Sequence, residues 1–94
     1  MIYLSGKHDF FSNESFGRAE KKAKKIDELV LDPRKQIDAK MRKRKTSEQI
    51  MGIRLSLIDM CSSVFMIKGW ELSPEANREL GYAMGQGKQV YFER

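Results

Sequence analysis

The chain has few of the residues that define several classes of protein. Its 94 residues include one cysteine, one histidine, one tryptophan and two prolines. Cys61 cannot form an internal disulfide, and Cys61 with His8 cannot supply the ligands of a structural zinc site. No apolar run approaches the length of a membrane-spanning helix. These absences argue against a disulfide-stapled, zinc-stabilised or membrane-spanning domain, and we expect no metal or other cofactor.

The start of the chain carries no targeting pattern. Met1 leads directly into the apolar residues 2–4, so the sequence predicts no signal peptide. A single cysteine also fits a reducing compartment. We therefore expect a cytoplasmic protein with no membrane partner. The length allows one modest core, so a single domain over residues 1–94 is predicted.

The charge is basic and unevenly distributed. The formal net charge is +5, and lysines and arginines gather at residues 21–25 and 40–45. Such clusters attract nucleic acid and other polyanions, but they are also typical of a solvated helix face followed by a basic loop. No aromatic residue interleaves with them and no groove-reading motif accompanies them. Binding of nucleic acid or of an acidic host protein is therefore an alternative that we do not favour.

Apolar spacing alternates between strand-like and helix-like along the chain. Short apolar runs predict strands at residues 2–4, 29–31, 64–67 and 89–92. Helices are predicted over about residues 13–27, after the capping pair Thr46 and Gln49, and from Ser73 to about 85–87, with 35–45 a polar helix or partly ordered loop. The alternation predicts an α/β fold: a Rossmann-like, flavodoxin-like three-layer sandwich with a four-stranded parallel sheet. The methionines outside position 1 are predicted to fill the core.

The last quarter of the chain carries the strongest candidate site. A predicted strand ends at Gly69 and Trp70, and Ser73 then has the properties of a helix N-cap. Free N–H groups at such a turn can bind an anion. Glu79 follows on the same helix among small and apolar neighbours, where a carboxylate is costly unless it is used. Ligands of parallel sheets bind at the carboxyl ends of the strands, which is where these residues lie.

Two segments resemble a known family. The opening Ile2–Gly6 and the block Ser73–Ala83 resemble nucleoside 2-deoxyribosyltransferases and deoxynucleoside 5'-monophosphate N-glycosidases. In that family the opening lines the sugar pocket, and a Glu-Leu-Gly signature, here residues 79–81, follows in the later helix. The Gly-Trp-Glu pattern at residues 69–71 is most similar to a branch of short phage and bacterial proteins with no assigned activity.

The resemblance implies a nucleotide-like phosphorylated ligand and a role for each matching residue. Glu79 would be the nucleophile that attacks the anomeric carbon of a 2-deoxyribosyl group, because a carboxylate stabilises an oxocarbenium-like transition state. Ser73 would hold a 5'-phosphate, and Tyr3 and Gly6 would line the sugar and base pocket. Family relatives complete their pockets across a homodimer, so a homodimer is expected. If the chain is phage-encoded, it would act in the cytoplasm of a bacterial host.

Two departures from the family pattern shift the prediction toward binding. Lys7 stands where the family turn has proline, and Arg54 stands where family enzymes carry an acid. Together with Lys68 they would favour a phosphate-rich ligand. The predicted ligand-binding residues are Tyr3, Gly6, Lys7, Arg54, Gly69, Trp70 and Ser73, with Glu79 as the catalytic residue.

Each of these residues also has a structural interpretation. Glu79 could pair with Arg78, Lys88 or Arg54, Tyr3 could be a core residue, and Ser73 could be a plain N-cap. Asp9 could add an acid to the pocket, and Phe10 with Phe11 could fill the core or an interface. Three functions stay open: glycosidic cleavage or transfer, nucleotide binding without turnover as in a sequestering protein or a phage-encoded modulator of host metabolism or defence, and a basic module.

Overall fold

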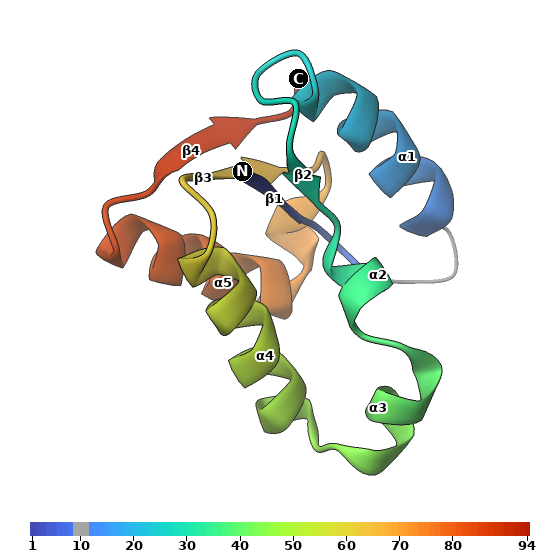
Figure 1. Ribbon diagram of the computed structural model, residues 1–94. Coiled ribbons are helices and arrows are strands. Elements are labelled where there is room, and N and C mark those ends of the chain that lie inside the picture. The colour runs from blue at the N-terminus through green and yellow to red at the C-terminus, as the bar shows by residue number, and fades with distance from the viewer. Residues whose placement is uncertain (9–11) are drawn as a thin grey trace.

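The computed structural model describes residues 1–8 and 12–94, so the predictions for Asp9, Phe10 and Phe11 lie outside the described residues. Figure 1 shows the course of the chain. Its elements are β1 (Ile2–Ser5), α1 (Ser12–Ala23), β2 (Val30–Leu31), α2 (Pro33–Gln36), α3 (Ala39–Arg44), α4 (Ser47–Asp59), β3 (Ser63–Met66), the 3₁₀ turn η1 (Trp70–Leu72), α5 (Pro74–Gly85) and β4 (Gln89–Phe92).

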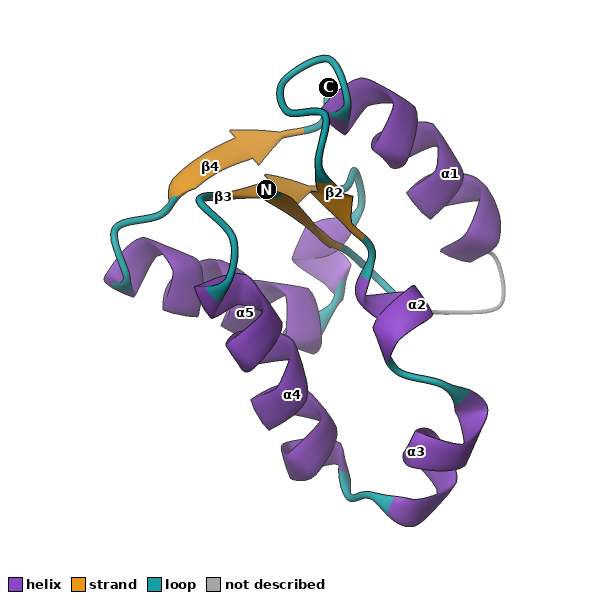
Figure 2. Cartoon of the chain, viewed as in Figure 1, coloured by secondary structure: helices purple, strands orange, loops and turns teal. Residues whose placement is uncertain are grey.

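The four strands form one parallel sheet in the order β2-β1-β3-β4. In Figure 2, α1 lies on one side of the sheet, and α4 and α5 lie on the other. The predicted α/β fold with a four-stranded parallel sheet between helices is therefore confirmed. This strand order is the flavodoxin-like one, in which the chain reverses direction across the sheet between β1 and β3, and ligands bind at that switch point.

The side chains of β1 alternate between two cores. Ile2 and Leu4 pack with Phe16 of α1, whereas Tyr3 packs in the core beneath α4 and α5. Successive side chains of a strand point to opposite faces, so Ser5 lies on the same face as Tyr3. Both are completely buried. The α5 side of the sheet thus carries two hydroxyl groups at the carboxyl end of its central strand.

The predicted helix starts of α4 and α5 are confirmed by their caps. The Gln49 backbone N–H donates to Thr46 Oγ1 at 3.1 Å, and the Thr46 N–H donates to Gln49 Oε1 at 2.9 Å. This is a complete capping box. At α5 the Ala76 N–H donates to Ser73 Oγ at 3.1 Å, and Pro74 occupies the first turn.

The first helix and the second strand are shorter than predicted. α1 ends at Ala23 rather than near Asp27, because the Ile26 N–H donates to the Ala23 carbonyl at 2.9 Å and tightens the chain into a turn. Asp27 instead pairs with the amino group of Met1 at 2.9 Å. Leu29 is 66% exposed and lies just before β2.

The basic segment after β2 forms two short helices. Asp32 caps α2 by accepting from the Arg34 N–H at 2.9 Å, and Asp38 caps α3 by accepting from the Met41 N–H at 2.9 Å. Ile37, buried between the two helices, anchors the segment. In Figure 1, α3 lies beside the N-terminal end of α4. The prediction of a polar helix or partly ordered loop is thereby refined to two capped helices.

Not all apolar residues of the helices are buried. Met51 and Met66 belong to the core, but Met60 is 65% exposed and Met84 is 64% exposed, so the core prediction is wrong for these two. Met60 follows the last turn of α4, and Met84 lies one residue past the buried Ala83 and faces away. Within residues 1–8 and 12–94, no helix combines the length and apolar character that crossing a membrane requires.

Glu93, directly after β4, links the end of this strand to α1 and to the residue Lys68 after β3. Its buried carboxylate accepts from Arg18 Nε at 2.8 Å and Nη2 at 3.0 Å, and it lies 3.0 Å from Lys22 Nζ. It also accepts from the Lys68 backbone N–H at 2.8 Å. These partners lower the pKa of Glu93 to about 2. The cluster joins three distant segments, and no local pattern in the sequence predicts it.

Candidate functional site

Glu79 projects from α5 into the core at the carboxyl end of β1. It shares the buried face of α5 with Ala76 and Ala83, at three- and four-residue spacings. The side chain is completely buried. Tyr3 Oη donates to Oε2, and Ser5 Oγ donates to Oε1 at 2.8 Å. The carboxylate is therefore held in one orientation by two strand hydroxyls at the switch point of the sheet.

Burial has the largest effect on the pKa of Glu79. Burial raises the pKa of Glu79, whereas the hydrogen bonds from Tyr3 and Ser5 and the charge of Arg54 oppose the rise. Burial and the adjacent carboxylate also raise the pKa of Tyr3 well above its usual value. The phenol therefore stays protonated and keeps donating. The pair is a polar centre with a fixed hydrogen-bond direction inside an apolar core.

The salt-bridge interpretation of Glu79 is wrong within the part of the chain that the structure describes. Arg78 pairs with Glu48, with Nη1 and Oε1 2.7 Å apart, and Lys88 Nζ donates to the Asp59 carbonyl at 3.3 Å. Arg54 contacts His8 and makes no ion pair with Glu79 in that range. Tyr3 combines the predicted core position with a polar contact, because its ring is buried while its hydroxyl reaches the carboxylate.

Ser5 is not among the predicted site residues, although the sequence holds a signal for it. Tyr3 is a predicted candidate, and residue i+2 of a strand lies on the same face. A helix that packs a carboxylate against Tyr3 therefore also presents it to Ser5. The alternation of side chains along β1 is by itself enough to indicate this second hydroxyl.

Gly6, directly after β1, lies against the side chain of Ile67, directly after β3. A Cβ atom at this position would stand 2.9 Å from the Cβ of Ile67, and the Ile67 N–H donates to the Ser5 carbonyl at 2.8 Å. The missing side chain thus leaves room for Ile67, which directly follows β3, beside the residue that follows β1. This contact gives Gly6 a packing role that sequence reasoning did not assign.

Gly6→Ala is expected to lower the free energy of unfolding by about 1 kcal/mol, because the new methyl group overpacks the strand ends. The substitution also moves Ser5 relative to Glu79. Gly17→Ala is the matched control: beyond its chain neighbours and the backbone of α1 itself, no atom lies within 4 Å of its added Cβ. That variant is expected to be slightly more stable than the parent, since alanine is the better helix former. Urea denaturation of the three proteins measures both changes, and equal stabilities would contradict the close approach.

Gly69 and Trp70 form the loop that leads from β3 to α5. Gly69 has a φ of 97°, which favours glycine, and it precedes the 3₁₀ turn. The Trp70 ring packs against Phe92 with a centroid distance of 5.6 Å. Trp70 is half-buried and packs on the last residue of β4. The ligand-binding roles of Gly69 and Trp70 stay predictions.

Two predicted ligand-binding residues, Ser73 and Lys7, differ in their exposure and in their hydrogen bonds. Ser73 is buried, and its hydroxyl both caps α5 and donates to Glu75 Oε2 at 3.3 Å. The N-cap role is therefore observed, and the phosphate role stays a prediction. Lys7 is exposed, and its carbonyl accepts from Ser12 Oγ at 3.0 Å.

Arg54 extends from the buried face of α4 between Met51 and Ile58, and it is only 8% exposed. Its Nη2 lies 3.4 Å from His8 Nδ1, and its buried Nε has no hydrogen-bond partner among the described residues. Its charge acts on both Tyr3 and Glu79. The structure thus brings Arg54, a predicted ligand-binding residue, close to Glu79 without neutralising it.

A hollow that the sequence pattern does not predict lies beside His8, the contact of Arg54. A cavity of about 570 Å³ is lined by His8, Asn13, Arg34, Ile37 and Arg42, among others. Burial first, and then the charges of Arg54, Arg42 and Arg34, lower the pKa of His8 to about 3, so its imidazole is neutral. Among the residues described, no three His, Cys, Asp or Glu side chains are placed to hold a metal ion.

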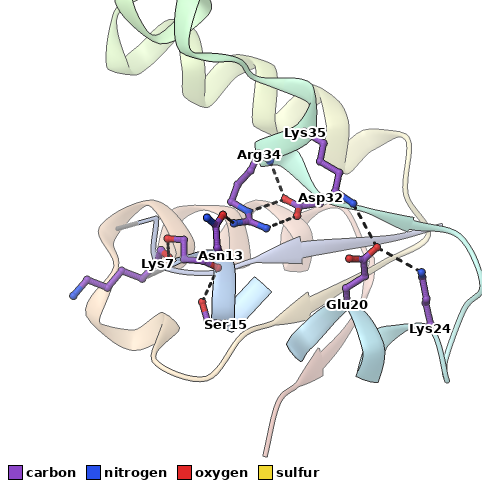
Figure 3. A network of polar contacts seen from close by, with 9 residues as sticks. Lys7, Asn13, Ser15, Glu20, Lys24, Asp32, Arg34 and Lys35 are labelled. Carbon is purple, nitrogen blue, oxygen red and sulfur yellow. Dashed lines mark hydrogen bonds and ion pairs between the residues drawn. The ribbon is translucent and has the colours of Figure 1, made fainter. Parts of the chain in front are cut away.

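Arg34 is fixed in one wall of this cavity (Figure 3). Its guanidinium donates to both carboxylate oxygens of Asp32, at 3.1 Å and 2.8 Å, and to Asn13 Oδ1 at 2.8 Å. The group lies 4.2 Å from the centre of the Phe16 ring. The hollow is lined by His8, the start of α1 and the segment of α2 and α3, which are far apart in the sequence, so residue spacing alone does not identify it.

Comparison with known proteins gives one match. A family model described as "Domain of unknown function (DUF4406)" matches residues 1–92. No curated protein and no solved structure matches the chain. The matched range runs from β1 to the end of β4 and includes Tyr3, Ser5 and Glu79.

Proposed function

Because the chain belongs to the DUF4406 family, whose description assigns no activity, we propose a function from the geometry of its site. The protein binds a nucleotide-like phosphorylated ligand at the carboxyl ends of β1 and β3, and ligand binding opens the site enough for Glu79, completely buried in the structure described above, to reach the sugar. We place it as a branch of the nucleoside 2-deoxyribosyltransferase superfamily. The observation that carries the proposal is the completely buried Glu79 carboxylate, oriented by Tyr3 and Ser5 at the switch point of the sheet.

In the catalytic form of the proposal, Glu79 cleaves the N-glycosidic bond. One carboxylate oxygen attacks the anomeric carbon, and the electron pair of the bond to the base leaves with the base, which takes a proton from water. Water then hydrolyses the glycosyl ester, or a second base displaces it. The hydroxyls of Tyr3 and Ser5 fix the attacking oxygen in place. Asp59 is no source of the proton, because it is exposed and accepts from Tyr82 Oη at 2.7 Å.

Binding without turnover is the second candidate, and Arg54 favours it. Arg54 stands where the resemblance expects an acid, and the acid that shares a cavity wall with it, Glu75, is exposed and accepts from the Ser73 hydroxyl. Burial also raises the pKa of Glu79, so the nucleophilic carboxylate form is less readily reached than at an exposed glutamate. Both observations support a protein that holds a phosphorylated nucleoside and returns it intact, as a sequestering protein or a modulator of host metabolism or defence would.

Chromatography of deoxynucleoside 5'-monophosphates after incubation with the protein separates the two candidates. With the parent chain we expect free base, and with Glu79→Gln a loss of about 10²-fold or more in its rate of release. Glu28→Gln makes the same chemical change at an exposed position in the turn before β2, so this control should retain activity. Intact nucleotide with measurable binding would favour the second candidate. No binding and no base release would contradict both.

We also propose a cytoplasmic homodimer. An apolar surface around η1 supports pairing, because Leu72 is 75% exposed and Phe92, which packs on Trp70, is 49% exposed. Sedimentation of the parent chain and of Phe92→Ser measures the association. A monomeric parent would contradict it.

A further inference from the structure

The basic side chains around the larger cavity are mostly neutralised by neighbouring carboxylates. Arg34 pairs with Asp32, and Lys35 Nζ lies 3.6 Å from Glu20, which also contacts Lys24 (Figure 3). The positive charge of this wall is therefore largely balanced within the protein. A second cavity nearby has more positive than negative side chains in its wall.

The second cavity lies between α3, α4 and the start of α5 and has a volume of about 220 Å³. Arg42, Lys45 and Arg54 line it, and Glu75 is the acidic residue in its wall. Within residues 1–8 and 12–94, none of these three cations lies in an ion pair with a carboxylate. Glu75 accepts from the Ser73 hydroxyl at 3.3 Å. The cavity therefore has an excess of positive charge, and Arg42 belongs to the walls of both cavities.

Arg54 is the buried member of the three cations that line this cavity. A guanidinium with 8% exposure has lost most of its water, yet in the described part of the chain its Nε has no hydrogen-bond partner and its Nη2 meets the nitrogen of His8. A buried guanidinium that contacts no carboxylate directly is costly, even though the charge of Glu79 is close enough to act on it. Nothing in the packing of α4 requires arginine here, since its neighbours on this face are Met51 and Ile58. An anion in the cavity would supply the missing partner.

We propose that the cavity between α3 and α4 is an anion site that binds the phosphate group of the ligand, held by Arg42, Lys45 and Arg54. Guanidinium groups match phosphate oxygens in two-point contacts, and lysine adds charge. The inference rests on the proposed function for the nucleoside part of the ligand, while the anion site itself does not depend on it. It assigns the phosphate to α3 and α4 rather than to Ser73, whose hydroxyl is already engaged at α5.

Isothermal titration with inorganic phosphate, pyrophosphate, 2'-deoxyadenosine and its 5'-monophosphate tests this assignment. We expect the phosphorylated probes to bind and 2'-deoxyadenosine to bind more weakly. Arg42→Gln and Arg54→Gln should each lower affinity for the phosphorylated probes about tenfold, the effect of losing one charged hydrogen bond. Arg44→Gln removes the same charge from the same helix at an exposed position that lines neither cavity. Its affinities should match those of the parent.

The outcomes separate this inference from the proposed function. If phosphate and pyrophosphate bind in an Arg42-dependent manner but no nucleoside adds affinity, the anion site stands and the proposed function fails. If the monophosphate binds equally well to the parent, Arg42→Gln and Arg54→Gln, the anion site is overturned and the proposed function stands. No binding of any phosphorylated probe overturns the anion site as well. Arg42 is exposed, so its variant keeps the test valid if Arg54→Gln fails to fold.

Discussion

Tyr3→Phe is expected to lower the free energy of unfolding by about 2 kcal/mol near neutral pH, since it deletes a donor to a buried carboxylate. The ring stays in place and only the hydroxyl is lost, so no cavity of note forms. Glu79 then keeps Ser5 as a hydroxyl donor, at 2.8 Å. Urea denaturation monitored by circular dichroism measures the change.

The size of this effect should depend on pH in a defined direction. Burial raises the pKa of Glu79 in the folded state above its unfolded value. Below the unfolded pKa the group is protonated in both states and costs nothing. As pH rises through the unfolded and then the folded pKa, the unfolded state ionises first and stability is lost. Tyr3→Phe removes a group that lowers the folded pKa, so its cost should grow as pH rises through this range.

Tyr82→Phe provides the matched control for this experiment. It deletes a hydroxyl that donates to a carboxylate, Asp59, at 2.7 Å, but at an exposed site. Water replaces that hydrogen bond, so we expect a much smaller change in stability. Equal effects of Tyr3→Phe and Tyr82→Phe would contradict a buried, constrained Glu79.

Glu93→Gln is expected to cost about 2 kcal/mol at neutral pH, because a buried carboxylate with several N–H donors becomes neutral. Arg18 and Lys22 are 46% and 42% exposed, so solvent screens part of the attraction and the cost stays below that of a fully buried pair. Thermal unfolding of the variant should show a lower midpoint. The loosened end of β4 should also exchange its amide protons faster.

The pH dependence of Glu93 has the opposite sign to that of Glu79. The folded pKa is lowered from 4.5 to about 2, so the stabilisation is complete above the unfolded pKa and is lost as pH falls toward 2. The parent and Glu93→Gln should therefore converge in stability in acid. Glu48→Gln is the control, because Glu48 forms a similar two-point pair with Arg78 at an exposed site. If it destabilised the protein as much as Glu93→Gln, burial would not be the cause.

Much of the fold could be predicted because local signals and global topology agree. The capping box at Thr46 and the Ser73-Pro74 start place α4 and α5 correctly, and alternating elements imply a parallel sheet. Glu79 could be singled out because a carboxylate among small and apolar residues conflicts with a buried helix face. That conflict is visible in one segment of sequence.

The features that could not be predicted depend mostly on contacts between segments far apart in the sequence. The Arg42 and Arg54 cavity needs α3 to fold back beside α4, and the Asp32 and Asp38 caps that bend the chain there are not part of the predicted pattern. Glu93 gives no local signal, because its partners are in α1 and after β3. The core prediction for Met60 and Met84 rests on hydrophobicity alone, although one residue of displacement along a helix turns a side chain toward solvent.

The sheet is assembled from strands that are far apart in the chain. Ile2 of β1 is aligned with Ser63 of β3, and the Tyr3–Glu79 hydrogen bond spans 76 positions. Chains dominated by such contacts fold more slowly than helical proteins of similar length, because large loops must close first. α1 and α4 can form early from local hydrogen bonds, whereas the Glu79 carboxylate sheds its water only when β1, β3 and α5 meet. Formation of the site is thus a late event in folding, and amide exchange that reports docking of α5 would also report the moment at which the site exists.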